Sequence, residues 1–373
     1  MNNLVQIGPL TVSINGNNEV TNQIIQELGQ VEPISCNNID IELNIHDAEK
    51  PSSYIPKYFS GGRSMNFNEN EYFVGSENYF DYVVNGAFSN DLIKIDVFIK
   101  QKSLNYKQKI KALKRAELSN LSSLIRSAIL SYPLFWNIVH LALLKKESSF
   151  IHAAIIEKND LATIFTGTGG AGKTSLCLEL LRQSNIKYLS EDFGIIDSNG
   201  NAYFNPKAIS LYRSDVVFGN PIAQLAIETL PKDTRKKWNL LTKIFDEDQI
   251  VKVLPKNVLT ENRLSKNPKI KNVIYMIREK CSSLVLEDVE LDEFAERITN
   301  VTMREIKVLL ETLYLIAADA PKTLNYKDPS EIFQKTKNVY LKSFGHLRPK
   351  ILHVPYKTSP DKIVDYLSKN NII

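Results

Sequence analysis

The segment from Gly167 to Thr174 carries the clearest chemical signature in this sequence. It reads Gly167-Thr168-Gly169-Gly170-Ala171-Gly172-Lys173-Thr174 and matches the pattern G-x-x-x-x-G-K-[ST] in full. Glycines let the backbone curl so that successive N–H groups face phosphate oxygens, and the start of a following helix adds a partial positive charge. In this pattern the Lys173 ammonium contacts the β- and γ-phosphates of a nucleotide, and the Thr174 hydroxyl is a ligand of Mg²⁺. We therefore expect residues 167–175, which include Ser175, to bind ATP with Mg²⁺.

Two adjacent carboxylates, Glu191 and Asp192, end the next apolar run of the chain, 18 and 19 positions after Lys173. Beside a phosphate loop, such a pair can divide the work: one carboxylate holds Mg²⁺ and the other accepts a proton from an attacking hydroxyl. The alternative is that they are two surface acids that open a loop. We expect Asp192 to ligate Mg²⁺ together with Thr174, and the pattern leaves open which of the two acids is the base.

A second acid pair, Glu287 and Asp288, also follows a short apolar run, in the manner of the strand and acids that follow phosphate loops in ATPases. It continues into the very acidic stretch 289–297, which is typical of a solvated connection. The sequence therefore favours Glu191 and Asp192 over this distal pair.

His152 lies 15 positions before Gly167. An isolated histidine on an apolar strand is most often a core residue, but the register of His152 with the glycine-rich loop favours a place in the site. The remaining histidines have no metal-ligand spacing with cysteine or with one another, so we expect no protein zinc site.

Together, His152, the loop and the acid pair resemble the HPr kinase/phosphorylase family and its HPr-kinase-like relatives. The nucleotide fold of that family is shared with ATP-dependent phosphoenolpyruvate carboxykinases, and in it a β-hairpin precedes the loop. The resemblance implies that His152, Lys173, Glu191 and Asp192 form the catalytic set around the transferred phosphate, with one acid as base toward a seryl hydroxyl. It spans about residues 148–365 and is strongest over 151–197. It also implies a homo-oligomer, because the family tends to assemble.

Two departures from the family pattern bear on the substrate. Where HPr kinases pair two aspartates, this chain has Glu191 and Asp192. In HPr kinases a signature with an acid two positions before an arginine follows the pair, and it is not reproduced around residues 210–213 of this chain. The second departure argues against HPr itself as acceptor. We therefore expect an ATP-dependent kinase that phosphorylates a hydroxyl, on Ser or Thr of a peptide or protein or on a small hydroxyl compound. The alternative is a regulatory nucleotide-binding ATPase module without a dedicated acceptor.

The elements that must position these residues can be predicted from the apolar pattern. Residues 151–165 comprise two apolar runs joined by a turn-like Glu-Lys-Asn-Asp, which predicts a hairpin directly before the loop. Residues 175–183 have the composition of an amphipathic helix, and 186–197 predicts a strand that ends in the acid pair, followed by a second β run. This order of strand, loop, helix and strand predicts an α/β fold with ligands at the carboxyl edge of the sheet.

The remainder of the chain predicts a two-part organisation. Residues 1–105 read as a mostly β accessory domain, with strands expected at 10–14, 39–45, 72–74, 81–84 and 93–99 and a helix at 20–28. Residues 106–147 read as a helical connection broken by Pro133, and 148–373 as the HPr-kinase-like catalytic domain. Between residues 100 and 115 there are seven basic residues and no acid, which is either a docking face for an acidic partner or a solvated segment.

Composition excludes several classes of protein. The chain is 43% hydrophobic and carries a net charge of only +4, so disorder is excluded and charge gives no reason to expect nucleic acid binding. The longest apolar stretch, 134–144, is too short to span a membrane, and the first residues lack the pattern of a signal peptide. Three scattered cysteines (Cys36, Cys177 and Cys281) favour a reducing compartment, so we expect a cytoplasmic protein that binds neither nucleic acid nor membrane.

Overall fold

The computed structural model describes residues 3–29, 38–51, 53–55, 57–60, 63–67, 71–75, 79–89, 92–100, 106, 109–110, 115, 120–130, 134–217, 219–245, 249–319 and 328–373. It is a mixed α/β structure, as the sequence predicts, and it divides into two compact units. The N-terminal unit comprises residues 1–113, 118–146 and 306–334. The glycine-loop unit comprises residues 114–117, 147–305 and 335–373. Cys36, Pro133 and most of the basic run at 100–115 lie outside the described residues.

The N-terminal unit is built on an eight-stranded sheet with the order β1-β2-β3-β8-β7-β6-β5-β4. The pairs β2–β3 and β3–β8 are parallel and the other neighbours are antiparallel. All five strands expected from the sequence are present, as is the helix at 20–28. The elements of this unit are β1 Asn3–Ile7, β2 Leu10–Asn15, α1 Glu19–Leu28, β3 Ile41–His46, β4 Tyr58–Ser60, β5 Arg63–Phe67, β6 Glu71–Gly75, β7 Phe80–Asn85, β8 Ile93–Ile99, α3 Leu121–Ile129, α4 Phe135–Lys145 and α11 Lys307–Asp319.

The glycine-loop unit is built on a second sheet, with the order β13-β12-β9-β10-β16-β18-β17, and β11 also pairs with β9. Its elements are β9 Ser148–Lys158, β10 Leu161–Thr166, α5 Lys173–Leu180, β11 Ile186–Ser190, β12 Phe193–Asp197, β13 Ala202–Tyr203, β14 Ile209–Tyr212, α6 Arg213–Val217, α7 Pro221–Glu228, α8 Lys232–Ile244, β15 Ile250–Val253, α9 Pro255–Val258, a 3₁₀ turn Glu261–Arg263, β16 Lys269–Glu279, β17 Val285–Asp288, α10 Leu291–Glu305, β18 Lys350–Pro355 and α13 Pro360–Lys369. Helix α12, Pro329–Phe344, begins in the N-terminal unit and continues into this one.

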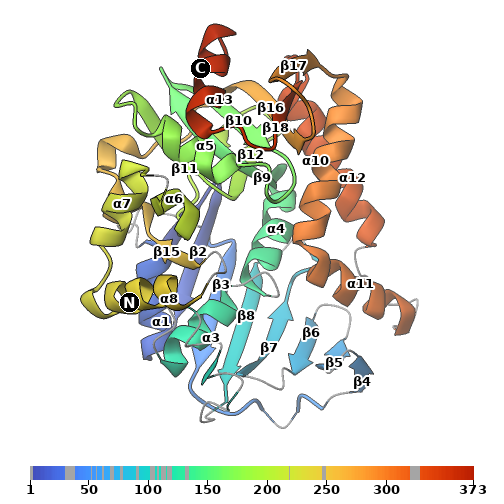
Figure 1. The fold of residues 1–373 in the computed structure, drawn as a ribbon. Coiled ribbons are helices and arrows are strands. Elements are labelled where there is room, and N and C mark those ends of the chain that lie inside the picture. Colours follow the sequence, from blue (N-terminus) through green and yellow to red (C-terminus); the bar gives the residue numbers. More distant parts are fainter. Residues whose placement is uncertain are drawn as a thin grey trace. The chain divides into compact units, whose positions relative to one another are not determined.

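Helices cover both faces of this second sheet, so its central strands are apolar without alternation. On one face, Ala154, Ile156 and Phe165 pack in a core with residues of α5, α7, α8 and α13. On the other face, Ile151 and Ile155 pack with residues of α10 and α12. Figure 1 shows α5 and α13 beside this sheet on one side and α10 and α12 on the other. Strand β10, whose carboxyl end begins the glycine-rich loop, therefore lies in a sheet that is packed between two layers of helices.

The division of the chain differs from the sequence-based one at two places. The helical connection expected at 106–147 belongs almost entirely to the N-terminal unit, and so do residues 306–334, which were expected in the catalytic domain. Within the part of the chain that the structure describes, no helix combines the length and apolarity needed to cross a membrane.

Candidate active site

The glycine-rich loop connects β10 to α5, as the sequence predicts, and its conformation fits a bound phosphate chain. Gly167, Gly170 and Gly172 have φ values of 138°, 83° and 92°, in the region that favours glycine. The Lys173 ammonium donates to the carbonyl oxygens of Gly167 at 2.9 Å and Thr168 at 3.0 Å, so it lies within the curl of the loop. No side chain caps the start of α5 at Gly172, which leaves the first N–H groups of the helix available to an anion.

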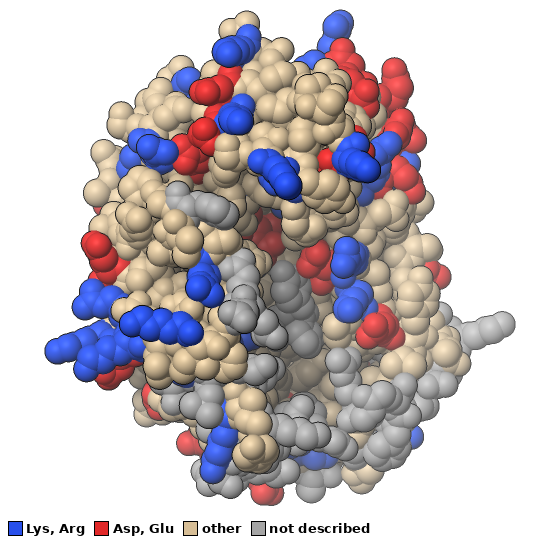
Figure 2. Space-filling model, in the orientation of Figure 1, with Lys and Arg blue, Asp and Glu red and all other residues tan. Residues whose placement is uncertain are grey.

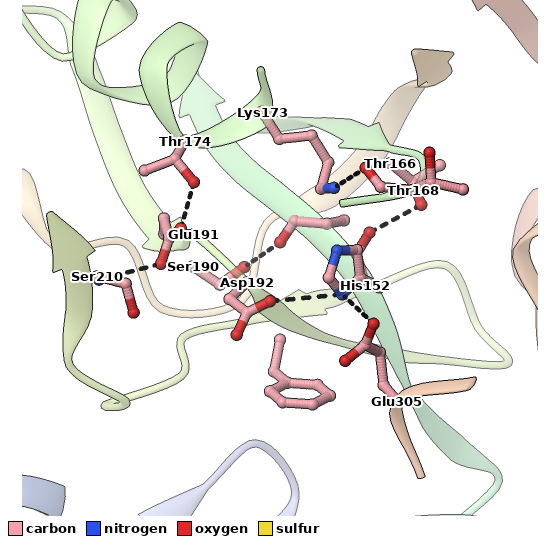
Figure 3. A network of polar contacts seen from close by, with 12 residues as sticks. His152, Thr166, Thr168, Lys173, Thr174, Ser190, Glu191, Asp192, Ser210 and Glu305 are labelled. Atoms are coloured by element: carbon pink, nitrogen blue, oxygen red, sulfur yellow. Dashed lines mark hydrogen bonds and ion pairs between the residues drawn. The ribbon is translucent and has the colours of Figure 1, made fainter. Parts of the chain in front are cut away.

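The hairpin β9–β10 and the strands β11 and β12 bring the acid pair to this loop. Both β11 and β12 pair antiparallel with β9, and Glu191 and Asp192 connect them. The Thr174 hydroxyl donates a short hydrogen bond to Oε1 of Glu191, and the Ser210 backbone N–H donates to Oε2 at 3.3 Å. Figure 3 shows the Glu191 side chain turned toward Thr174 and the Asp192 side chain turned toward His152. The two neighbouring acids therefore face different partners.

Asp192 lies between two nitrogen-bearing side chains. Its Oδ2 accepts a short hydrogen bond from the Lys207 ammonium, which also lies 4.4 Å from the centroid of the Phe193 ring. Its Oδ1 lies 3.4 Å from Nδ1 of His152. Strand pairing explains the second contact, because Phe193 of β12 is directly opposite His152 of β9.

A third carboxylate completes this cluster. Oε1 of Glu305, the last residue of α10, lies 3.6 Å from Nδ1 of His152 on the side away from the loop lysine (Figure 3). The His152 side chain is only 10% exposed and that of Glu305 is 24% exposed. Nδ1 of His152 thus lies between carboxylates from two separate elements. The Thr166 hydroxyl donates to the His152 carbonyl oxygen at 2.9 Å.

Burial and neighbouring charge separate the pKa values of these groups. Burial, followed by the charge of Asp192, raises the pKa of Glu191 to about 7. Burial alone would raise the pKa of Asp192 as well, but Lys207 and then His152 hold that pKa well below its usual range. The pKa of Lys173 is lowered to about 8 by burial, against the opposing effect of Asp192 and Glu191.

Burial and the nearby Lys173 charge lower the pKa of His152 to about 4, so the imidazole is neutral at physiological pH. A neutral imidazole contributes hydrogen bonds to a phosphate, and no positive charge. Positive charge beside the loop therefore comes from Lys173 and Arg278 and not from His152.

The other sequence-predicted residues are distributed as follows. Thr168, Gly169 and Gly170 form the exposed crest of the loop, and Ala171 is buried behind it. The Ser175 hydroxyl donates to Oδ1 of Asp215 at 2.7 Å, so its side chain faces the body of the unit.

The distal acids lie on the exposed edge strand β17, separated from β10 by β16 and β18. Glu287 pairs with Nε2 of His353 at 3.0 Å, and Asp288 pairs with Lys350. Both acids thus pair with side chains of β18, and such cross-strand pairs stabilise the edge of a sheet.

Three residues of the site neighbourhood were not predicted from the sequence. Lys207 and Glu305 join the acid cluster, and Arg278 lies against the loop, since a Cβ added to Gly172 would lie 2.9 Å from Nη2 of Arg278. Lys207 follows Pro206 and lies 15 residues after Asp192, so its place in the sequence close to the acid pair was the available signal. Glu305 and Arg278 are more than 100 residues from the loop in sequence and carry no motif.

A Mg²⁺ ion fits this site only with the help of a phosphate ligand. Among the described residues, no three His, Cys, Asp or Glu side chains are arranged to hold a metal ion by themselves. Mg²⁺ in nucleotide sites usually takes one or two protein ligands and fills its remaining positions with phosphate oxygens and water, so the Thr174 and Glu191 oxygens suit it.

No protein-family model matches the chain, and no curated protein matches it significantly.

Proposed function

We propose that the protein is an ATP-dependent phosphotransferase that phosphorylates a hydroxyl group. The observation that carries this proposal is the convergence of the loop residues Lys173 and Thr174 with Glu191, Asp192 and His152 in one partly buried cluster. The loop supplies donors for the phosphates, and the acids supply a metal ligand and a proton acceptor. Transfer to an alcohol needs these three parts together.

The contacts favour a division of roles between the two acids. Because the Thr174 hydroxyl bonds to Glu191, these two oxygens would hold Mg²⁺, where the sequence had suggested Thr174 with Asp192. Asp192 and His152 would then face the acceptor hydroxyl, with Lys207 beside the transferred phosphoryl group. Bound Mg²⁺ would neutralise the phosphate charge that develops during transfer.

A basic surface in the same unit supports a peptide or protein as the acceptor. Helix α8 carries five Lys and Arg residues and one Asp, and Figure 2 shows blue side chains gathered where this helix lies. Its exposed side also presents Leu240, 56% exposed, and Ile244, 62% exposed. A surface of this kind fits an acidic segment with apolar side chains better than it fits a small compound.

One contact favours the alternative of an ATPase module without a dedicated acceptor. The Lys207 ion pair weakens Asp192 as a base, because it stabilises the ionised carboxylate. Hydrolysis or simple nucleotide binding places a smaller demand on such a base than transfer to a serine hydroxyl does.

Incubation with Mg²⁺ and ATP labelled in the γ-phosphate distinguishes the two functions. Label on a Ser or Thr of an added acidic peptide or of a candidate protein is the expected result. Release of labelled inorganic phosphate alone would favour the ATPase, and a Lys173→Ala variant serves as the inactive control. If the wild-type protein neither bound nor turned over ATP, both functions would be refuted.

A further inference from the structure

Three parallel strands of the glycine-loop unit end at the same edge of the sheet. Strands β10, β16 and β18 are parallel neighbours in that order. The glycine-rich loop follows β10, Arg278 lies next to the end of β16, and Tyr356 follows β18 directly. Ligands of α/β sheets bind at this carboxyl edge, so groups there are candidates for further contacts with a nucleotide.

The position of the acids fixes which way a nucleotide would run along that edge. His152, Glu191 and Asp192 belong to β9 and to the β11–β12 connection, and these strands lie on one side of β10. Strands β16 and β18 lie on the other side. With the reacting phosphate facing the acids, the nucleoside end of the molecule faces Arg278 and Tyr356.

Arg278 joins the loop to the turn after β18. Its Nη1 donates to the Tyr356 carbonyl oxygen at 2.8 Å and its Nη2 to that of Thr358 at 3.4 Å. The same Nη2 lies against Gly172, where an added Cβ would approach to 2.9 Å. One guanidinium group thus lies between the loop and the Tyr356 turn, and its hydrogen bonds hold the backbone of that turn.

Tyr356 presents its ring to solvent from this fixed turn. The residue is 65% exposed, and the Thr358 N–H donates to the Pro355 carbonyl oxygen at 3.0 Å to close the turn. Helix α13 begins at Pro360 and packs against α5, the helix that starts at the loop. Because the backbone of the turn is hydrogen-bonded and a tyrosine has only two side-chain torsions, a base that stacks on this ring orders few degrees of freedom.

We propose that Tyr356 stacks on the base of the bound nucleotide, and that Arg278 is a positioning residue that holds Tyr356 beside the glycine-rich loop. This inference rests on the proposed function, since it assumes that the loop binds a nucleoside triphosphate. It adds the nucleoside subsite, which neither the loop motif nor the acid cluster supplies.

The test compares Mg·ATP with magnesium tripolyphosphate, which has the phosphate chain and no base. Binding of both is measured by calorimetry for the wild type, Tyr356→Ala and Tyr356→Phe. We expect Tyr356→Ala to weaken ATP binding by about tenfold to 100-fold, the range typical of base–aromatic stacking, and to leave tripolyphosphate binding unchanged. Tyr356→Phe keeps the ring and should retain ATP affinity. Tyr314→Ala removes a similarly exposed tyrosine, 61% exposed, and serves as the matched control.

Arg278→Lys tests the positioning role, because a lysine ammonium lacks the planar pair of nitrogens with which Arg278 donates separately to the Tyr356 and Thr358 carbonyl groups. A loss of ATP affinity without a loss of tripolyphosphate affinity supports that role, and an equal loss of both overturns it. The stacking role is overturned if Tyr356→Ala binds ATP as tightly as the wild type does. It is also overturned if this change weakens the binding of ATP and of tripolyphosphate together. If the wild type bound neither ligand, the proposed function would fail instead, so the two failures are distinguishable.

Discussion

Asp192 and Glu191 are neighbours in sequence, yet their surroundings give them opposite chemical character. Lys207 keeps Asp192 ionised, whereas burial and the Asp192 charge favour the protonated form of Glu191. A cation bound between Thr174 and Glu191 would reverse the preference of Glu191, because a nearby positive charge favours the carboxylate. Under the proposed function, metal binding and ionisation of Glu191 would therefore support each other.

Removal of the Lys173 ammonium should abolish nucleotide-dependent activity. In Lys173→Ala we expect turnover of ATP to fall by about 100-fold or more, since a charge contact to the transition state is lost. The measurement is the rate of ATP turnover at saturating Mg²⁺. Lys271→Ala, which removes an exposed lysine of the same unit, should keep the wild-type rate. Unchanged turnover in Lys173→Ala would refute the assignment of the loop.

The near acid pair should matter far more than the distal one. We expect Glu191→Ala or Asp192→Ala to lower acceptor phosphorylation by about 100-fold, in the range attributed to general-base and metal-ligand groups. The double change Glu287→Ala and Asp288→Ala should leave the rate within about twofold of the wild type, because those acids pair with His353 and Lys350 on an edge strand. The opposite pattern would make the distal pair the functional one.

The parts of the candidate site that the sequence predicts lie close together along the chain. The loop and the acid pair are separated by one helix and one strand, so motif and periodicity are enough to bring them to one sheet edge. Glu305 and Arg278 reach the site only through the packing of α10 and the pairing of β16 with β10. Such contacts depend on tertiary structure, which no local pattern of the sequence encodes.

At the scale of the elements, the loop requires glycine at some positions and merely contains it at others. Gly167 has a φ of 138°, and an added Cβ would lie 2.4 Å from the backbone oxygen of Met276 on β16. For Gly169 nothing lies within 4 Å of an added Cβ. The approach of β16 to the start of the loop therefore requires glycine at position 167, whereas nothing in the structure requires it at position 169.

Gly167→Ala should destabilise the protein and Gly169→Ala should not. We expect the free energy of unfolding to fall by about 2 kcal/mol or more in Gly167→Ala, from backbone strain and the clash with Met276. In Gly169→Ala it should change by less than about 0.5 kcal/mol. Urea unfolding of the two variants measures both values, and equal stability would show that β16 can move away from the loop.

His353 should make the β17–β18 pair sensitive to pH. Its hydrogen bond with Glu287, and then that with Glu279, raises its pKa despite partial burial. The folded state holds the His353 proton more tightly than the unfolded state does. The contacts of protonated His353 therefore add to the free energy of unfolding below the unfolded pKa of about 6.5, and this stabilisation is lost as pH rises through the folded pKa. We expect His353→Gln to lower unfolding free energy by about 0.5 kcal/mol at pH 6 and by much less at pH 8.5. A loss that grew with pH would contradict this ion-pair explanation.

The elements themselves were predictable where the apolar pattern was regular. The hairpin β9–β10 and the strands β2, β3, β7 and β8 follow runs of apolar residues in the sequence. Strands β1, β4 and β5 were missed, and each is short or carries polar residues such as Asn3, Ser64 and Asn66. These strands form because neighbouring strands of the sheet are present to pair with them, so their own propensity is a poor guide.

At the scale of the whole molecule, the two units are not consecutive along the chain. Residues 306–334 belong to the N-terminal unit although they lie between α10 and most of α12 in sequence. The apolar runs of α11 gave no sign of this, because a buried helix has the same pattern whichever unit it packs with. The sequence-based catalytic domain at 148–373 therefore includes a segment that belongs elsewhere.

A fragment of residues 147–373 should consequently expose apolar surface. Leu309 and Leu313 of α11 are 3% and 0% exposed in the full chain, and the fragment lacks the rest of the N-terminal unit. We expect the fragment to bind the dye ANS more strongly than the full chain and to associate in size-exclusion chromatography. The double change Leu309→Ser and Leu313→Ser should reduce both effects, whereas a monomeric fragment with no added dye binding would show that α11 is stable without the N-terminal unit.

The same division of the chain sets the order in which the protein can fold during synthesis. The strands of the N-terminal sheet leave the ribosome first, but their unit is complete only after residue 334 has been made. At typical translation rates of about 5–20 residues per second, that sheet waits roughly ten seconds or longer for its last helix. During this interval residues 306–334 of the unit are missing, so we expect the nascent chain to expose apolar surface to which a chaperone can bind.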